Sequence, residues 1–551
     1  MEDKTGSAVQ EELGVKFKKF AEGKQKSKAK SFNPKLKIFR EFSLATLSAL
    51  LKTKTAQSQR KQQTENAEGD STTQKCDSLV SALDALANTG VTGLQWKKKL
   101  GDEVRVTLSD HSDVSLLTAN AEENSLTTRK FCLDGCRVPG DPTDKQGTSE
   151  VHVCQADAKA VMMMETFQYI YINAWKNCVT YLESACHSIA PGGMLCVVVS
   201  DSSMFARSPH VVKRWYAVDV MKTEYLKEMA ARVVLADLAA SAGRYNKALV
   251  PQYVLAVEDF LLVCVKVTRG HTATESSVNE ICKLMHCRFC EERVFMPQQL
   301  APVENPYSML PCQCKEKNPG KTAVLLGPMW KGPIYCPTFL NVMQQEGKSL
   351  GLSAKFSTLV SLLQCESVCA TLSFSSGDGG GNNNRREGGA LSGISPSNGQ
   401  NDKTVQSKDR DCGAEKAMGD KSETAQIVEE GNAGADGKCS VFSNVTSDGK
   451  PDGSKRKGTR DSVPENAPTP VKKLRFEDSK DDPQLTPARN VPFYQHVNKL
   501  KKMKIPKLDQ LVTIIQHRGY FACRTHFDPC AIRTTANVDQ FLNVLQPQCE
   551  K

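Results

Sequence analysis

Four cysteines in two close pairs carry the strongest chemical signal of the sequence. Two residues separate Cys287 from Cys290, and after a gap of 21 residues a single residue separates Cys312 from Cys314. Two thiolate pairs joined by a loop suit a closed tetrahedral Zn²⁺ site, whose role is structural because no coordination position is open. The alternative is a set of buried free thiols in a chain with 21 cysteines. The repeated pairing favours zinc, and His286, next to the first cysteine, is a candidate substitute ligand.

A second group of residues has the types found in nucleotide sites. Residues 84–93 read Asp-Ala-Leu-Ala-Asn-Thr-Gly-Val-Thr-Gly, a turn from a strand into a helix whose first glycine is Gly90. Glycine lets the backbone approach a ligand, and the helix N-terminus favours polar groups. At later strand ends, Asp110 can accept hydrogen bonds from ribose hydroxyls, and Asp157 with Ala158 can hold an adenine edge. Two interpretations stay open: a cofactor site, or the ordinary Asp and Gly residues of α/β turns. The glycines are too sparse for a dinucleotide fingerprint.

Short apolar runs and helical segments alternate around these residues. The expected strands include runs at 78–86, 104–108, 151–154, 167–172 and 194–199, and helices are expected at 44–51 and 179–190. Strands separated by helices, each followed by a polar residue, predict an open parallel α/β sheet. Ligands of such sheets bind at the carboxyl ends of the strands. The polar residues expected there are Asp84, Asp110, Asp157, Asn173 and Asp201.

The composition of the 551 residues indicates a folded body with a sizeable solvated part, because hydrophobic residues make up 39% and aromatic residues 6%. The longest apolar candidate for a membrane span, 253–267, is interrupted by Glu258 and Asp259. The first residues lack the apolar stretch of a secretory signal. We therefore expect neither a membrane nor a secreted protein, and we expect the remaining cysteines to be free thiols in a reducing compartment.

Changes in composition divide the chain into five parts. Residues 1–30 are Lys-rich and predict a disordered basic tail, whereas 31–270 hold the alternating strands and helices. Residues 271–372 contain the cysteine pairs and begin a second domain. Residues 373–489 are rich in Gly, Asn, Ser and Asp and predict a disordered insert, and the second domain resumes at 490–551.

Basic residues gather in two of these parts. Within the insert, clusters at 455–457 and 472–475 predict a nuclear import signal, which does not distinguish nucleoplasm from nucleolus; ordinary charge in a flexible loop is the alternative. In the last part, basic residues such as Lys501, Lys502 and Arg524 are interleaved with aromatic residues. This arrangement suits phosphate contacts with base or ribose stacking, and a solvated basic face is an equal alternative. The net charge of +10 is compatible with a polyanionic partner.

Several short motifs occur in one order along the chain. They are Phe32-Asn33-Pro34 with Arg40, the turn 84–93, Asp110, Asp157-Ala158, Glu224 with Glu228 and Arg232, Gly327-Pro328-Met329-Trp330 with Gly332-Pro333, and Arg524-Thr525-His526-Phe527-Asp528-Pro529 with Arg533-Thr534. Together they resemble the motifs of the tRNA (guanine-N2)-dimethyltransferase family, with the greatest similarity to its vertebrate "like" branch. The resemblance covers residues 31–372 and 491–551, and it is specific because the last two motifs are unusual and stand in the family's order.

The resemblance implies a class I, Rossmann-like methyltransferase sheet followed by a family-specific C-terminal α/β domain. It implies S-adenosylmethionine as methyl donor and tRNA as substrate, with dimethylation of the exocyclic N2 of a guanine near the junction of the D and anticodon arms. It assigns Arg40, Asp84, Gly90, Asp110, Asp157 and Ala158 to the cofactor, Asn173 and Trp175 to the guanine, Cys287, Cys290, Cys312 and Cys314 to zinc, and Lys501, Lys502, Arg524 and His526 to the RNA.

One departure from the family pattern concerns catalysis. Where the family has Asp-Pro-(Phe/Tyr)-Gly, this chain has Asn173-Ala174-Trp175-Lys176. Asn173 can still accept a hydrogen bond from the guanine amine and Trp175 can stack on the base. A neutral Asn, however, neither takes a proton nor stabilises developing positive charge. The sequence thus leaves an active methyltransferase, a weak or inactive tRNA-binding relative, and a zinc-containing scaffold without RNA affinity as hypotheses.

Overall fold

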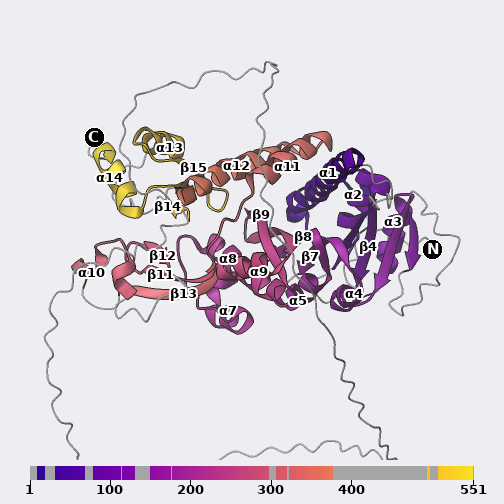
Figure 1. The fold of residues 1–551 in the computed structure, drawn as a ribbon, viewed down its shortest axis with the longest axis horizontal. Coiled ribbons are helices and arrows are strands. Elements are labelled where there is room, and N and C mark those ends of the chain that lie inside the picture. The colour runs from indigo at the N-terminus through magenta and orange to yellow at the C-terminus, as the bar shows by residue number, and fades with distance from the viewer. Residues whose placement is uncertain are drawn as a thin grey trace, which may run out of the picture. The chain divides into compact units, whose positions relative to one another are not determined.

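A computed structural model describes most of the chain outside the predicted tail and insert (Figure 1). The import clusters 455–457 and 472–475, together with Trp175, Lys501 and Lys502, lie outside the described residues. The described ranges are 9–18, 32–68, 79–112, 114–130, 149–174, 177–200, 202–296, 306–318, 322–375, 493–496 and 507–549.

The first part of the chain forms an eight-stranded sheet with the strand order β5-β6-β4-β3-β7-β8-β10-β9. The first six strands in this order are parallel, and β10 is antiparallel to both of its neighbours. The predicted open α/β sheet is therefore confirmed, and an antiparallel pair extends one edge. The strands are β3 (Val80–Asp84), β4 (Val104–Asp110), β5 (Thr127–Lys130), β6 (Glu150–Gln155), β7 (Phe167–Ala174), β8 (Ile189–Val199), β9 (Lys247–Val257) and β10 (Phe260–Arg269).

Helices connect and cover these strands. The expected helix 179–190 ends two residues early, because Ile189 is already extended and begins the next strand, which runs through Pro191. The buried helix α8 is rich in Ala, Leu and Val, which suits its position against the sheet and the second part of the chain. The helices are α1 (Lys37–Glu68), α2 (Val91–Leu100), α3 (Ser115–Glu123), α4 (Ala158–Met164), α5 (Val179–Ser188), α6 (Met204–Arg207), α7 (Pro209–Tyr216) and α8 (Leu226–Gly243).

A small N-terminal hairpin packs against this domain. Its strands, β1 (Gln10–Glu12) and β2 (Val15–Phe17), lie within the tail that the sequence predicted to be disordered, and for residues 9–18 that prediction is wrong. The side chains of Val15 and Phe17 are buried, with at most 1% of their surface exposed. A short charged segment can be ordered in this way because its few apolar side chains are buried against the α/β domain.

The second part of the chain contains two three-stranded sheets and further helices. The first sheet has the order β12-β11-β13 and the second β14-β16-β15. None of the helices in the described ranges is long and apolar enough to cross a membrane. The elements are α9 (His271–Asn279), β11 (Ile281–Cys287), β12 (Arg293–Phe295), α10 (Cys314–Lys317), β13 (Ala323–Trp330), α11 (Pro337–Ser349), α12 (Ala354–Ser375), β14 (Gln495–His496), α13 (Leu508–His517), β15 (Ala522–Arg524), β16 (Ala531–Thr534) and α14 (Val538–Cys549).

A buried network of charged residues joins segments that are far apart in the sequence. Arg533 of β16 donates to Glu228 of α8 at 2.8 Å and to Glu366 of α12 at 2.9 Å. Arg232 pairs with Glu228 one helical turn away at 2.9 Å. Nδ1 of His526 lies 2.5 Å from Glu366. All five side chains are at most 1% exposed, so the charges are compensated within the protein rather than by water.

Candidate functional site

A cavity of about 410 Å³ lies at the carboxyl ends of β3, β4 and β7. The strand order changes direction here, because the sheet continues from β3 through β4 on one side and through β7 on the other. Ligands of open α/β sheets bind at such a switch point. Four of the predicted site residues line the cavity: Arg40, Asp84, Asp110 and Asn173.

Asp84, the last residue of β3, is a buried acid in the wall of the cavity. It is 1% exposed, and its Oδ2 has no hydrogen-bond partner among the described residues. Burial raises the pKa of Asp84 to about 7 against the opposing effect of the Gly93 N–H, and the negative charge of Asp110 adds to the increase. A buried carboxylate without a full set of partners suits a ligand that offers a cation or a hydrogen-bond donor.

The glycines of the turn 84–93 shape the wall of the cavity. Gly90 precedes α2 with φ at 77°, in the left-handed region that favours glycine. An added Cβ at Gly93 would lie 2.2 Å from Cδ2 of Leu108, so α2 can pack this closely on β4 only with glycine there. Gly90 does not line the cavity, although its neighbours Asn88, Thr89 and Val91 do. Its position indicates a role in bending the chain around the cavity.

Asp110 ends β4 and is held by the loops on both sides. Its Oδ2 accepts from the backbone N–H of Asn88 at 3.1 Å, and its Oδ1 accepts from the backbone N–H of Ser112 at 2.9 Å and from the Ser112 hydroxyl. These bonds fix the carboxylate at the mouth of the cavity, where 12% of the side chain is exposed. A fixed carboxylate in such a position can accept from a pair of ribose hydroxyls.

Asp157 and Ala158 lie beside the cavity rather than in its lining. Asp157 caps the N-terminus of α4 by accepting from the backbone N–H of Lys159 at 2.8 Å, and about half of its side chain is exposed. Ala158 is buried. Tyr181 also lines the cavity, although the sequence gave no reason to select it. Burial is the main cause that raises the pKa of Tyr181, and the negative charges of Asp157 and Asp110 nearby add to the increase.

Asn173 is the next-to-last residue of β7 and is half-buried at the cavity wall. Tyr171, two residues earlier on the same face of the strand, also lines the cavity and has a buried hydroxyl without a partner among the described residues. The sequence analysis missed Tyr171, although the period of two along a strand would have placed it beside Asn173. Trp175 is outside the described ranges, so its predicted role stays a prediction.

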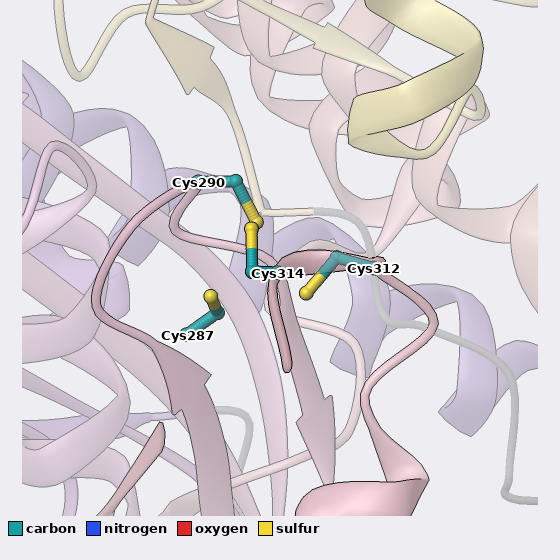
Figure 2. Close-up of side chains that lie close together, drawn as sticks. All are labelled: Cys287, Cys290, Cys312 and Cys314. Atoms are coloured by element: carbon teal, nitrogen blue, oxygen red, sulfur yellow. The ribbon is translucent and has the colours of Figure 1, made fainter. Parts of the chain in front are cut away.

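The four predicted metal ligands come together around one point (Figure 2). Their sulfur atoms lie within 4.8 Å of one another, whereas tetrahedral Zn–S bonds of ~2.3 Å place sulfurs ~3.8 Å apart. Cys287 ends β11 and Cys290 follows in the next turn, whereas Cys314 is the first residue of α10 and Cys312 lies two residues before it. His286 does not join this group, because its Nδ1 lies 2.7 Å from the hydroxyl of Tyr225 in the interior. The candidate substitute ligand is therefore ruled out in this arrangement.

The predicted RNA-binding residues have different surroundings. Arg524 is exposed and forms two hydrogen bonds with Asp509, at 2.6 and 2.7 Å. His526 is fully buried against Glu366, so it cannot contact an RNA strand and its assignment to the RNA is wrong. A histidine among Arg, Thr and Asp residues looks like a surface residue in the sequence, since its acidic partner lies far away along the chain.

Comparison with protein families gives a match over much of the chain. The model of the N2,N2-dimethylguanosine tRNA methyltransferase family matches residues 14–377. Proteins named tRNA (guanine(27)-N(2))-dimethyltransferase from Homo sapiens and Mus musculus are 31% and 32% identical over 93% of this chain. The chain spans about 60% of the length of these relatives. A tRNA (guanine(26)-N(2))-dimethyltransferase of Schizosaccharomyces pombe is 22% identical over 49% of this chain and 48% of its own length.

A solved structure has the same fold. The complex of Trm1 from Pyrococcus horikoshii with S-adenosyl-L-methionine aligns over 98% of this chain and 99% of its own, with a TM-score of 0.57 and 14% sequence identity. The sheet described above is therefore the Rossmann-like sheet that the family resemblance implied. At this level of identity the similarity establishes the fold and leaves the chemistry to the residues of the cavity.

Proposed function

Since the chain belongs to the N2,N2-dimethylguanosine tRNA methyltransferase family, we propose that it transfers methyl groups from S-adenosylmethionine to the exocyclic N2 of a guanine in tRNA. The observation that carries this proposal is the cavity at the carboxyl ends of β3, β4 and β7, with Arg40, Asp84, Asp110 and Asn173 in its wall. The relatives that match 93% of the chain are named for guanine 27, so we propose guanine 27, near the junction of the D and anticodon arms, as the target.

The lining residues fit the parts of S-adenosylmethionine, which supplies an electrophilic methyl group. Arg40 suits the carboxylate of its amino-acid part, and the unpartnered Oδ2 of Asp84 suits the amine. Asp110 suits the ribose hydroxyls, and Asp157 with Ala158, beside the cavity, suits the adenine. The turn with Gly90 bends the chain around this space.

Asn173 is proposed to align the guanine amine through its side-chain oxygen, and Trp175 to stack on the base. The guanine must leave its helical stack to reach the cavity, as other base-modifying enzymes require. Arg524, whose side chain is 52% exposed, is proposed to contact the RNA, together with Lys501 and Lys502. The pairing of Arg524 with Asp509 has to open or to remain at the edge of that contact.

A second function is favoured by one observation, the neutral Asn173 where the family has Asp. Removal of a polar contact that acts only in the transition state costs ~2.7–4 kcal/mol, or 10²–10³-fold in rate. With such a loss at Asn173, the chain would be a tRNA-binding protein that performs little or no methylation. Such a protein would retain salt-sensitive tRNA binding, because its Lys and Arg side chains neutralise several phosphates of the RNA.

The test is transfer of labelled methyl groups to total tRNA that lacks the modification, with wild type beside Asn173→Ala and Asn173→Asp. Label at guanine N2 with wild type and not with Asn173→Ala supports the enzyme. Primer extension should then stop at position 27, and a stop at 26 would assign the other junction guanine. Label with Asn173→Asp alone, beside tight tRNA binding by wild type, supports the binding protein. If the wild-type chain neither transfers label nor binds tRNA, the enzyme and the binding protein are both contradicted, and the zinc-containing scaffold is the hypothesis that is left.

Zinc and nuclear import are two further parts of the proposal. The close grouping of the four sulfur atoms supports a structural zinc ion held by Cys287, Cys290, Cys312 and Cys314. Metal analysis of the purified chain should give one zinc ion per molecule. The clusters 455–457 and 472–475 support import into the nucleus. Replacement of the basic residues of both clusters by Ala should leave a fluorescent fusion outside the nucleus, whereas continued nuclear accumulation would refute import by these clusters.

A further inference from the structure

Arg40 is clamped by Glu12, the last residue of β1 in the N-terminal hairpin, and β1 precedes residue 14, where the match to the family begins. Nε of Arg40 donates to Oε1 of Glu12 at 2.6 Å, and Nη2 donates to Oε2 at 2.7 Å. Both residues are buried, with 8% of Glu12 and 5% of Arg40 exposed. Burial alone raises the pKa of Glu12, but the hydrogen bonds and the charge of Arg40 outweigh it, and the pKa is lowered. Glu12 is therefore ionised at neutral pH.

The hairpin is itself held in place by side chains of the α/β domain. Asn124, which follows the last residue of α3, accepts from the backbone N–H of Lys16 at 2.9 Å and donates to its carbonyl at 2.6 Å. Asn120, one helical turn earlier, makes the same pair of bonds with Lys18, at 2.8 and 3.2 Å. Gln95 of α2 donates to the Glu12 carboxylate at 3.0 Å. The position of Glu12 is thus fixed from two helices.

The remaining contacts of Arg40 fix the plane of its guanidinium. The ring of Phe32 lies 4.6 Å from its Cζ, and Nη1 donates to the carbonyl of Asn33 at 3.3 Å. Phe32 in turn packs on Phe17 of the hairpin, with 4.6 Å between ring centroids. A guanidinium has five N–H groups, and these bonds use three. One N–H on each terminal nitrogen is left for a ligand of the cavity that Arg40 lines.

We propose that Glu12 is a positioning residue that aims Arg40 at the carboxylate of the bound methyl donor, an inference that rests on the proposed function. Without this clamp, the guanidinium can turn toward Asp84. The charge of Arg40 already acts on Asp84, where it opposes the increase in pKa that burial causes. Arg40 would then neutralise the acid that suits the donor's amine and leave the donor's carboxylate without a partner. The N-terminal hairpin is in this sense a part of the cofactor site.

The opposite effect of Glu12 has to be considered, because its charge weakens the attraction of Arg40 for any anion. The geometry favours positioning, since Glu12 occupies the edge formed by Nε and Nη2 and a ligand would use other N–H groups. Glu12 and the ligand therefore do not compete for the same hydrogen atoms. If the charge effect prevailed, removal of the charge would strengthen binding rather than weaken it.

The test compares two ligands that differ only in the carboxylate, S-adenosylmethionine and decarboxylated S-adenosylmethionine, by calorimetric titration of the full chain. Glu12→Gln should weaken binding of the first by about tenfold or more and of the second by less than about twofold. Glu12→Asp, which keeps the charge but shortens the reach, should weaken the first in the same direction. The matched control is Glu11→Gln, an exposed acid on the same strand, which should change neither.

A cycle with Arg40 separates positioning from a general loss of structure. In an Arg40→Met background, Glu12→Gln should have no further effect on the ratio of the two dissociation constants, because the group that it positions is gone. Equal weakening of both ligands by Glu12→Gln, no change, or tighter binding of S-adenosylmethionine would overturn the inference while the proposed function stands. Absence of binding to the wild-type chain would overturn both.

Discussion

Glu366 is the acid on which the buried charged network depends, and its replacement tests how the C-terminal segment is held. Its carboxylate accepts from Nε of Arg533 and from the Thr525 hydroxyl, each at 2.9 Å, and from the backbone N–H of His526 at 2.9 Å. Burial raises the pKa of Glu366, but the charges of His526 and Arg533 outweigh it and lower the pKa from 4.5 to about 2. We expect Glu366→Gln, which keeps the shape and removes the charge, to destabilise the folded chain strongly.

The magnitude follows from this shift. A difference of about 2.5 pKa units corresponds to about 3 kcal/mol, and removal of one partner from a buried ion pair costs ~3–5 kcal/mol. Since the pKa of Glu366 is lower in the folded state, its contribution is complete above pH 4.5 and is lost as the pH falls toward 2. The difference in free energy between wild type and Glu366→Gln should therefore be about 3 kcal/mol at pH 7 and about 1 kcal/mol at pH 3.

The assay is urea unfolding of both proteins between pH 3 and 8, with hydrogen exchange of residues 522–534 to locate the loss. Glu183→Gln is the control, because Glu183 is 61% exposed and its partner Arg244 is 3.7 Å away; it should change stability by less than ~0.5 kcal/mol. A difference below ~1 kcal/mol for Glu366→Gln at pH 7, or one that does not decline in acid, would refute this account of the network.

Three further changes test the cavity and the metal group. Gly93→Ala places a Cβ against Leu108 of β4 and should cost ~1–3 kcal/mol in thermal unfolding; an unchanged melting temperature would contradict the close packing of α2. Cys312→Ser should reduce bound zinc, measured by mass spectrometry, from one ion per chain to well below one; full occupancy would exclude this ligand set. Asp84 has its pKa raised from 3.8 to about 7, so the stability it contributes is complete below pH 3.8 and is lost as the pH rises to 7. Asp84→Asn should therefore be more stable than wild type at pH 8, by up to about 4 kcal/mol, and equal stability across pH 4–8 would refute the shift.

The sheet and the metal group could be predicted because their signals are local. β4 begins with apolar residues at alternate positions, β8 ends in the apolar run 194–199, and the two cysteines of each pair are close in the sequence. The clamp on Arg40 and the partner of His526 could not be predicted, since Glu12 and Glu366 are distant in sequence from the residues they bind. Only the folded chain shows which of its 62 acidic residues meet a buried cation.

The buried network also joins two parts of the chain that residues 376–492 separate in the sequence, so these parts can be held together without a covalent connection. Glu228 and Glu366 precede residue 376, and Arg533 follows residue 492, yet the three are joined by direct hydrogen bonds. A polypeptide ending after α12 and a second one beginning at residue 490 would still contain both sides of this interface. We expect the two fragments, when co-expressed, to assemble into one particle, so that each can be isotopically labelled or substituted independently of the other.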